Sequence, residues 1–315
     1  RIAAEAAWLY TPRDTVRAHQ TRGFSGERAP ESPAAGALIY YWLAEEPAER
    51  IELEILDAGG EVLRTFRSEE REAATGRSET VEDDDEDDNE PDLPAERGMN
   101  RFVWDLKREG PDLIDGALFS LAYTGGYFVL PGTYTARLTV GGESSTKSFR
   151  VTKDPRLQEV TQADLEAQNA LLEEIVGDLD GVHDAIRELR SVREQARDVA
   201  RRAGEAGYEG DWSEQAEAIA DKLTAVEDEL IQHRAETGQD LLNYPPRLDD
   251  QLAYLYSHVY PAYGRPTQGD YQRLDDLRVE LAPHLEALRA VIDIDVAAFN
   301  EALRAAGVPA VIWRR

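Results

Sequence analysis

Two histidines occur where a metal site between helices would place them. His233 follows Glu229 by four residues, and His284 follows Glu280 by the same interval. Helix bundles bind pairs of metal ions through inward Glu and His side chains, but those sites use Glu-x-x-His spacing and two further glutamates. A histidine on an apolar helix face that hydrogen-bonds to a neighbouring helix fits this spacing better. We therefore predict no metal ligand here.

Carboxylates are too numerous to indicate a particular active site. The chain has 63 Asp and Glu residues, so a pair at the separation that glycoside hydrolysis needs could be chosen almost anywhere. A solvated acidic surface explains them more simply. The nucleophile, zinc-protease and phosphate-loop patterns G-x-S-x-G, H-E-x-x-H and G-x-x-x-x-G-K do not occur. We predict no catalytic residue and no cofactor.

The densest acidic run is a candidate for cation binding. Residues 82–90 are all Asp, Glu or Asn, and calcium prefers several carboxylate oxygens. An EF-hand loop needs glycine at its sixth position and glutamate at its twelfth, and Asp83 to Pro94 has neither. The sequence predicts loose cation association at most.

Exposed aromatic residues could form a platform for sugar rings. The candidate ligand contacts are Tyr41, Trp42, Tyr123 and Tyr127. Adjacent Tyr40 and Tyr41 must point to opposite faces of a strand, so one is expected in the core and one at the surface. Glycan contact is an alternative to a purely structural role for these side chains.

The charge balance limits the classes of partner. The formal net charge is -28, and the only lysines are Lys107, Lys147, Lys153 and Lys222. Nucleic acid and anionic lipid are bound through basic residues, so neither is an expected partner. An acidic, lysine-poor composition suits a salt-rich environment, where screening weakens self-repulsion. The absence of cysteine excludes disulfides and thiolate chemistry.

Short strands are expected in the first half of the chain. Residues 37–43 are aromatic and β-branched, and residues 51–55 alternate apolar and acidic side chains. Further strands are predicted at 62–67, 99–106, 134–140 and 144–151. Residues 68–96 are expected to be a disordered acidic insertion, and residues 110–126 a second long loop.

Helices are expected in the second half. Apolar residues recur at alternating intervals of three and four along 172–189, 216–230, 248–259 and 274–291, which is typical of helices packed in a bundle. Thr161 and Asp164 have the spacing of a capping box and predict the start of a first helix of about 40 residues, about 60 Å long.

These patterns predict an α+β chain. We expect an N-terminal lead-in over 1–30, an Ig-like antiparallel β-sandwich over 31–152, and an elongated, mostly antiparallel helical bundle over 153–315. No run of eighteen apolar residues occurs, so no membrane span is predicted. Because the sequence starts at Arg1 rather than methionine, we expect a mature product or an excised fragment.

Several segments in order resemble a known bacterial family. They are similar to the C-terminal region of large proteins whose N-terminal part is a sortilin-like β-propeller of BNR (Asp-box) repeats. The segments are ESPAAGALIYYWL at 31–43, LEILDAGGEVLRTF at 53–66, GMNRFVWDL at 98–106, PGTYTARLTV at 131–140, VTKDPR at 151–156, AYLYSHVYPAYGRPTQGDYQRL at 253–274 and EALRAAGVPAVIW at 301–313. The Trp104-Asp105 and Pro131–Tyr134 signature also resembles the Ig-like domain of flagellar hook-capping proteins.

The resemblance implies an accessory role. Such parent proteins are often labelled glycosyl hydrolases because of their propeller repeats, and the Asp-box pattern S-x-D-x-G-x-x-W is absent from this chain. Any catalytic site would then lie in the propeller, which would be the partner within the same secreted or cell-envelope protein. The predicted role is that of a non-catalytic spacer, brace or docking surface. The alternatives are a carbohydrate-binding module and one part of a glycoside hydrolase.

Overall fold

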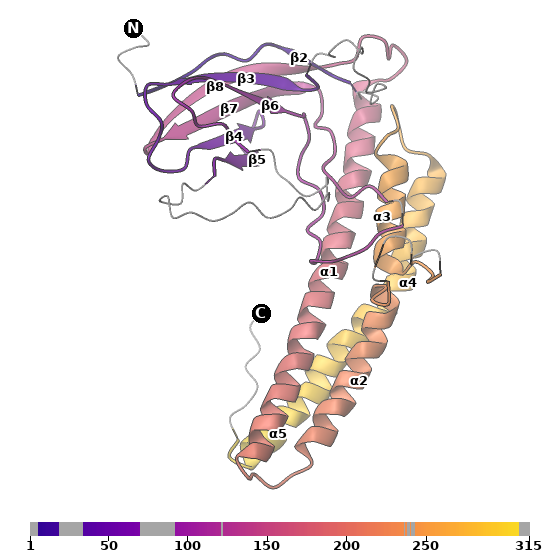
Figure 1. The fold of residues 1–315 in the computed structure, drawn as a ribbon. Coiled ribbons are helices and arrows are strands. Elements are labelled where there is room, and N and C mark those ends of the chain that lie inside the picture. Colours follow the sequence, from indigo (N-terminus) through magenta and orange to yellow (C-terminus); the bar gives the residue numbers. More distant parts are fainter. Residues whose placement is uncertain are drawn as a thin grey trace. The chain divides into compact units, whose positions relative to one another are not determined.

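The computed structural model describes residues 6–18, 34–69, 92–120, 122–235, 237, 240 and 243–308. It is a mixed α+β fold with two sheets and a series of helices (Figure 1). Two compact units are present. The first comprises Arg1–Gly110, Gly125–Asn169 and Tyr263–Arg265, and the second comprises Pro111–Thr124, Ala170–Ala262 and Pro266–Arg315. The acidic run at 82–90, with its predicted cation association, lies outside the described residues.

The first unit contains a three-stranded and a five-stranded sheet. The three-stranded sheet has the order β1-β3-β6. The five-stranded sheet has the order β2-β8-β7-β4-β5. In chain order the strands are β1 (Ala7–Leu9), β2 (Thr15–Arg17), β3 (Ala37–Leu43), β4 (Glu52–Leu56), β5 (Val62–Arg67), β6 (Gly98–Trp104), β7 (Gly132–Val140) and β8 (Glu143–Lys153).

The N-terminal residues contribute a strand to each sheet. Residues 1–30 were expected only to lead into the first domain, but β1 pairs antiparallel with β3, and β2 pairs parallel with β8. Three-residue strands are too short to show a period-two pattern, which explains why the sequence did not predict them. The other strand pairs in the described residues are antiparallel, as expected.

The apolar core of this unit lies where the buried faces of the two sheets meet. Trp104 of β6 contacts the rings of Tyr134 and Phe149 in the other sheet, with centroids 5.5 and 6.1 Å apart. Phe102 contacts Phe66 in the same way at 4.6 Å. Tilted and edge-to-face contacts of this kind are arrangements that aromatic pairs favour, and they place these rings on the inward faces of the strands.

Proline 12 ends the pairing of β1 with β3. The ladder register joins Trp8 to Trp42, and the Tyr10 N–H donates to the Tyr40 carbonyl at 3.0 Å. Hydrogen-bonded pairs in an antiparallel ladder recur at every second residue, so the next pair would join Pro12 to Leu38. Proline has no N–H to donate. The chain leaves β3 here and crosses to the five-stranded sheet.

The second unit contains most of the helical residues. In chain order the helices are α1 (Gln162–Glu205), α2 (Trp212–Leu230), α3 (Leu248–Val259), α4 (Gln268–Ala290), the π-helical segment η3 (Val291–Val296) and α5 (Ala297–Ala305). The first three predicted apolar series each lie in one helix, and the fourth runs through α4 into η3. The predicted capping box is confirmed, because the Asp164 carboxylate accepts the Thr161 N–H at 3.0 Å.

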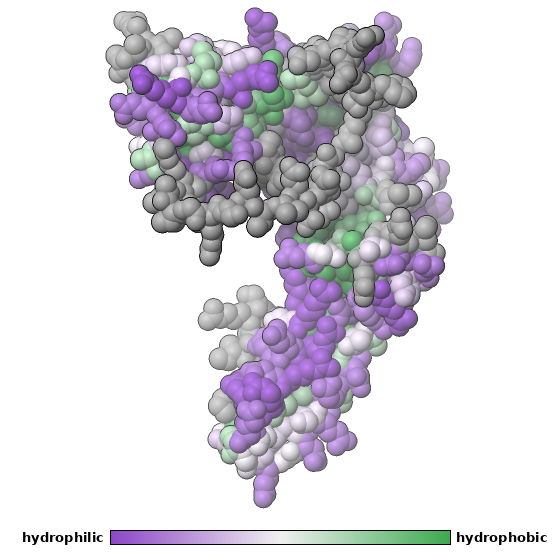
Figure 2. All heavy atoms as spheres, in the orientation of Figure 1, coloured by the Kyte–Doolittle hydropathy of each residue, from purple (hydrophilic) through white to green (hydrophobic). Residues whose placement is uncertain are grey.

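Arginine–carboxylate pairs join α1 to α2. Buried Glu227 of α2 accepts from Arg190 and from Arg193 of α1, both at 2.6 Å. Arg197 and Glu217 form a bidentate pair further along the helices, at 3.0 and 2.7 Å. Figure 2 shows a mostly hydrophilic surface over this part of α1 and α2. The exposed Arg197–Glu217 pair is expected to contribute little to stability.

The loop between β6 and β7 packs on the helices of the second unit. His183 Nδ1 accepts the Ile114 N–H at 2.9 Å, and Asp250 Oδ1 accepts the Ser120 N–H at 3.0 Å. His183 is fully buried, and burial lowers its pKa to about 4. The ring is therefore neutral at pH 7 and can accept through Nδ1. Residues 111–120 and 122–124 thus form a strap that side chains of α1 and α3 hold in place.

Substitution of Gly36, at the start of β3, tests this fold through its stability. Its φ is +136°, and a Cβ there would lie 2.0 Å from the Trp104 carbonyl oxygen. Gly36→Ala should lower the free energy of unfolding by more than the roughly 1–3 kcal/mol of backbone strain alone. Urea titration of Gly60→Ala is the control, since Gly60 has a φ of +86° and no atom near its Cβ position. Equal losses in the two variants would contradict the close approach.

Aspartate 249 gives the second unit a pH-dependent stability. It is buried beside Asp250 at the start of α3, and burial raises its pKa to about 7. Because the folded chain holds this proton more tightly than the unfolded chain, Asp249 raises the free energy of unfolding below about pH 4. That contribution is lost as the pH rises through about 7. Asp249→Asn should therefore be more stable than the wild type at pH 8, by at most about 4 kcal/mol.

The matched control is Asp276→Asn, since Asp276 is exposed on α4. Denaturant unfolding between pH 4 and 8 measures the difference between each variant and the wild type. The advantage of Asp249→Asn should grow with pH, and that of the control should stay constant. A pH-independent advantage would contradict a buried carboxyl whose Oδ2 has no hydrogen-bond partner among the described residues.

Candidate functional site

The outer faces of the two sheets differ in chemistry. On the five-stranded sheet, Glu54 and Arg137 lie opposite each other and form a bidentate pair at 2.5 and 2.7 Å. That pairing lowers the pKa of Glu54 through the hydrogen bond from Arg137. The three-stranded sheet instead carries large apolar and aromatic side chains outward, which are Trp8, Leu38, Tyr40, Trp42, Met99 and Val103. Outward-facing sheet surfaces are usually polar, so this face is unusual.

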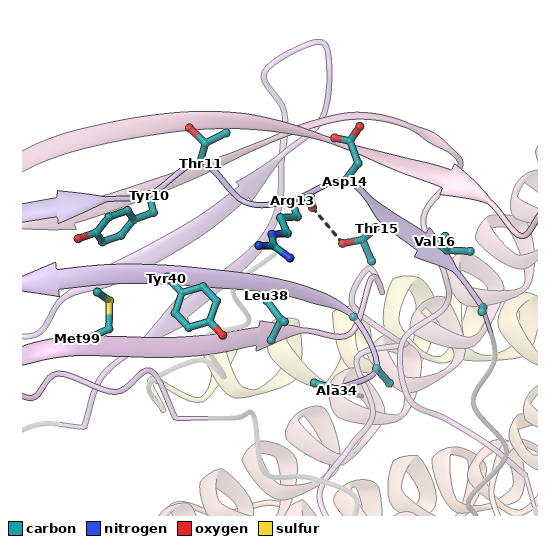
Figure 3. Close-up of a pocket in the computed structure, with 13 residues that line it drawn as sticks. Tyr10, Thr11, Arg13, Asp14, Thr15, Val16, Ala34, Leu38, Tyr40 and Met99 are labelled. Carbon is teal, nitrogen blue, oxygen red and sulfur yellow. Dashed lines mark hydrogen bonds between the residues drawn. The ribbon is translucent and has the colours of Figure 1, made fainter. Parts of the chain in front are cut away.

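A groove of about 830 Å³ opens beside β3 on the first unit. It lies where the chain crosses from β1 to β2, so its walls are the segment 10–18 and the start of β3. Figure 3 shows the side chains that line it, with Tyr10 and Arg13 on the crossing segment and Leu38 and Tyr40 on β3. The lining residues are Tyr10, Thr11, Arg13, Asp14, Thr15, Val16, Ala18, Ala34, Ala35, Gly36, Leu38, Tyr40 and Met99. The volume is within the usual range for ligand pockets.

The polar groups of the groove have unused hydrogen-bonding capacity. The hydroxyls of Tyr10 and Tyr40 and the guanidinium of Arg13 have no partner among the described residues. Asp14 is engaged, because its Oδ1 accepts the Arg150 N–H at 3.0 Å. Tyr40 is 38% exposed and Met99 is 59% exposed. An apolar floor with a few convergent polar groups is the usual composition of a binding site.

Acidic residues are absent from the strands beneath this face. None occurs in β1, β3 or β6, although the whole chain has 63. Arg101 lies directly opposite Tyr40 in the ladder, and its side chain has no partner within the described ranges. The face is therefore locally cationic and apolar on a strongly acidic chain.

The structure corrects the choice of exposed tyrosine. Tyr41, predicted as a ligand contact, is fully buried, and its hydroxyl donates to the Pro94 carbonyl. Burial also raises its pKa well above the usual range. Tyr40 is the exposed member of the pair. Trp42, the second predicted contact, is half-buried on the outer face opposite Trp8.

The other two predicted contacts have packing roles. Tyr123 belongs to the strap, where its ring stacks on Tyr260 and Tyr256 with centroids 4.5 and 6.0 Å away. Tyr127 is 3% exposed in the first unit, with the Arg108 guanidinium 5.8 Å from its ring centroid. The structure therefore does not bring the four predicted contacts together.

The histidines considered for a metal site are not arranged as a helix pair. His233 lies beyond α2, which ends at Leu230, and its Nδ1 is 3.3 Å from Asp228. Its expected partner Glu229 pairs with Arg247, and Glu280 pairs with Arg273. The described residues contain no group of three or more potential ligands around a metal position. In the same part of the chain, no helix is sufficiently long and apolar to span a membrane.

A second hollow of about 510 Å³ on α1 is lined by charged side chains, and its arginines are already engaged. Arg190 and Arg193 pair with Glu227, Arg197 pairs with Glu217, and Arg201 pairs with Asp198. These charges are neutralised in place. The groove beside β3 is therefore the stronger candidate for a binding site.

Most of the residues that line the groove were not predicted from the sequence. Leu38, Tyr40 and Trp42 alternate with buried residues along β3, and this parity was visible in the sequence. Tyr10 and Arg13 were not considered, because residues 1–30 showed no strand pattern. Pro12 was the available signal, since proline marks a point where strand pairing stops.

Comparison of the chain with protein-family models, with curated proteins and with solved structures found no match.

The orientation of the two adjacent tyrosines can be tested through stability. Tyr41→Phe leaves the Pro94 carbonyl without its donor and should lower the free energy of unfolding by about 1 kcal/mol. Tyr40→Phe should change it by less than about 0.5 kcal/mol, because Tyr40 is exposed. Chemical denaturation of both variants makes the comparison. A larger loss for Tyr40→Phe would mean that the faces of β3 are reversed.

Proposed function

We propose that the chain is a non-catalytic accessory module of a larger β-propeller protein, and that the outer face of the β1-β3-β6 sheet is its docking surface. The observation that carries this proposal is the largely apolar groove beside β3, next to strands without acidic residues, on a chain of net charge -28. Contiguous exposed apolar surface on a soluble protein usually marks an interaction site. Depletion of acidic residues with enrichment of Tyr, Trp, Met and Arg is also the composition of interface cores.

The proposal includes an Ig-like β-sandwich for the first unit. Strands β3 and β6 share one sheet, and β4, β7 and β8 share the other. The same division separates strands B and E from C, F and G in the immunoglobulin fold. Tyr134 near the start of β7 donates its hydroxyl to the Leu130 carbonyl at 2.6 Å, which resembles the tyrosine corner of that fold.

For the second unit we propose an elongated, mostly antiparallel helical bundle that acts as a spacer or brace. The ion pairs that join α1 to α2, and Arg278 of α4 to Asp178 of α1 at 2.6 Å, support helices packed side by side. The upstream propeller partner and a secreted or cell-envelope location rest on the family resemblance.

A carbohydrate-binding module is the second candidate function. The observation in its favour is the pair of tyrosines, Tyr10 and Tyr40, at the groove. Their rings could stack on sugar faces, and their hydroxyls have no partner in the described part of the chain. A glycan microarray distinguishes this candidate, because it requires saturable glycan binding that is lost in Tyr40→Ala.

The proposed function predicts binding to a propeller domain. The β-propeller domain of the parent protein, produced as a separate polypeptide, should bind the chain in isothermal titration calorimetry. Tyr40→Ala and Met99→Ala should each weaken binding by about tenfold or more, because aromatic and apolar side chains at the centre of an interface dominate its affinity. Val62→Ala on β5 is the matched control, since Val62 has similar exposure on the other sheet.

A chromogenic-glycoside panel, with and without calcium and in high salt, provides the complementary test. We expect turnover only from mixtures that include the propeller domain. Turnover by the chain alone would contradict a non-catalytic module. Propeller binding that is equally sensitive to Val62→Ala and Tyr40→Ala would contradict the choice of face.

A further inference from the structure

The edge of β3 is open along the groove. The Tyr40 carbonyl of β3 accepts the Tyr10 N–H, which lies on the β1 side of the strand. Alternate residues of a strand form their backbone hydrogen bonds on the same side. The N–H and C=O of Leu38 therefore point into the groove. The described residues provide no hydrogen-bond partner for them on that side. Continuing the β1–β3 register would place Pro12 opposite Leu38, and proline has no N–H to donate.

Side chains flank this open edge on both sides. Tyr10 continues the line of β1, and Tyr40 and Met99 lie on the outer face next to Leu38. A strand placed beside Leu38 would direct alternate side chains onto this apolar surface. Strand addition of this kind gains affinity from main-chain hydrogen bonds and specificity from pockets for alternate side chains.

Two arginines determine the charge of a fitting ligand. Arg13 lines the groove and Arg101 lies opposite Tyr40, and neither has a partner among the residues that the structure describes. Charges further than about 8 Å away are largely screened at physiological salt. Among the residues that line the groove, Asp14 is acidic, and its Oδ1 accepts the Arg150 N–H. The two arginines outnumber it, so an anionic group is complementary to them.

We propose that the groove binds an extended peptide segment of a partner protein by strand addition to β3 at Leu38, with an acidic side chain of the peptide paired to Arg13. This inference rests on the proposed docking function and adds the form and charge of the bound segment. A glycan lacks the row of amide groups that would complete the ladder, so the open edge favours a peptide. The paired arginine then selects peptides in which Asp or Glu lies next to apolar residues.

Selection from a phage-displayed library of random twelve-residue peptides tests the charge and the form of the ligand. The full chain is the bait, and synthetic copies of enriched peptides are titrated by fluorescence anisotropy. We expect enrichment of Asp or Glu beside apolar residues. Arg13→Gln should weaken binding by about ten- to a hundredfold, as expected for loss of a charge-assisted hydrogen bond. Arg67→Gln, which removes an exposed arginine of β5, should have no effect.

Amide hydrogen exchange provides a readout specific to strand addition. Saturating peptide should slow exchange at the Leu38 amide by about tenfold or more. The Ile39 amide is the internal control, because odd residues of β3 face β6 and are already paired. Two sets of peptides, N-methylated at odd or at even positions, should differ in binding. The set that keeps the N–H groups facing β3 should bind, and the other set should not.

Three outcomes would overturn the inference. The first is that Arg13→Gln leaves the affinity of the selected peptides unchanged. The second is an unchanged exchange rate of the Leu38 amide. The third is that no linear peptide binds more tightly than about 1 mM. Glycan binding at the groove without peptide binding would also overturn it. If the propeller domain still binds through Tyr40 in any of these cases, the docking function stands and only strand addition fails. If neither peptide nor propeller binds, both proposals fail.

Discussion

The missing N–H of Pro12 is the constraint on which the candidate site depends. A residue able to donate at this position could have continued the β1–β3 ladder to Leu38. The chain instead diverges after Tyr10, and Asp14 is fixed to the other sheet by the Arg150 N–H at 3.0 Å. The divergence opens a groove of about 830 Å³ and leaves a strand edge unpaired. Gly36 supports the opposite end of that edge, where any Cβ would collide with the Trp104 carbonyl oxygen. The groove is thus produced by backbone chemistry at two positions.

Charge placement then distinguishes one sheet face from the rest of the chain. The outer face of the five-stranded sheet has cross-strand ion pairs such as Glu54 with Arg137, which satisfy their own charges. The face of β1, β3 and β6 has no acidic residue, and it carries arginines without partners in the described residues. Unpaired cations beside exposed aromatic rings satisfy no internal requirement of the fold. This is why we assign that face, rather than the arginine-lined hollow of α1, to a partner.

The sequence was informative where periodicity is local. Intervals of three and four predicted the helical segments, and Thr161 with Asp164 predicted the start of α1. A run of aromatic and β-branched residues predicted β3, but the sequence could not decide which face of this strand is buried, because Tyr40 and Tyr41 are chemically identical. Only the nonlocal hydrogen bond from Tyr41 to Pro94 settles that choice. His233 was predicted to lie on a helix, but α2 ends at Leu230. The backbone is extended at Ile231, with φ of -138° and ψ of 147°. The strap over α1 and α3 depends on contacts of His183 and Asp250 with residues far away in sequence, which no local pattern reveals.

We assign the contact between the chain and its partner to the outer face of the β1-β3-β6 sheet. The most direct test is a map of backbone amide chemical shifts of the labelled chain, recorded during titration with the unlabelled propeller domain. We expect the shift changes to concentrate on residues 10–16, 36–42 and 99–103, and the outer face of the five-stranded sheet to be unaffected. Changes confined to that other face, or to the helices, would rule out this assignment.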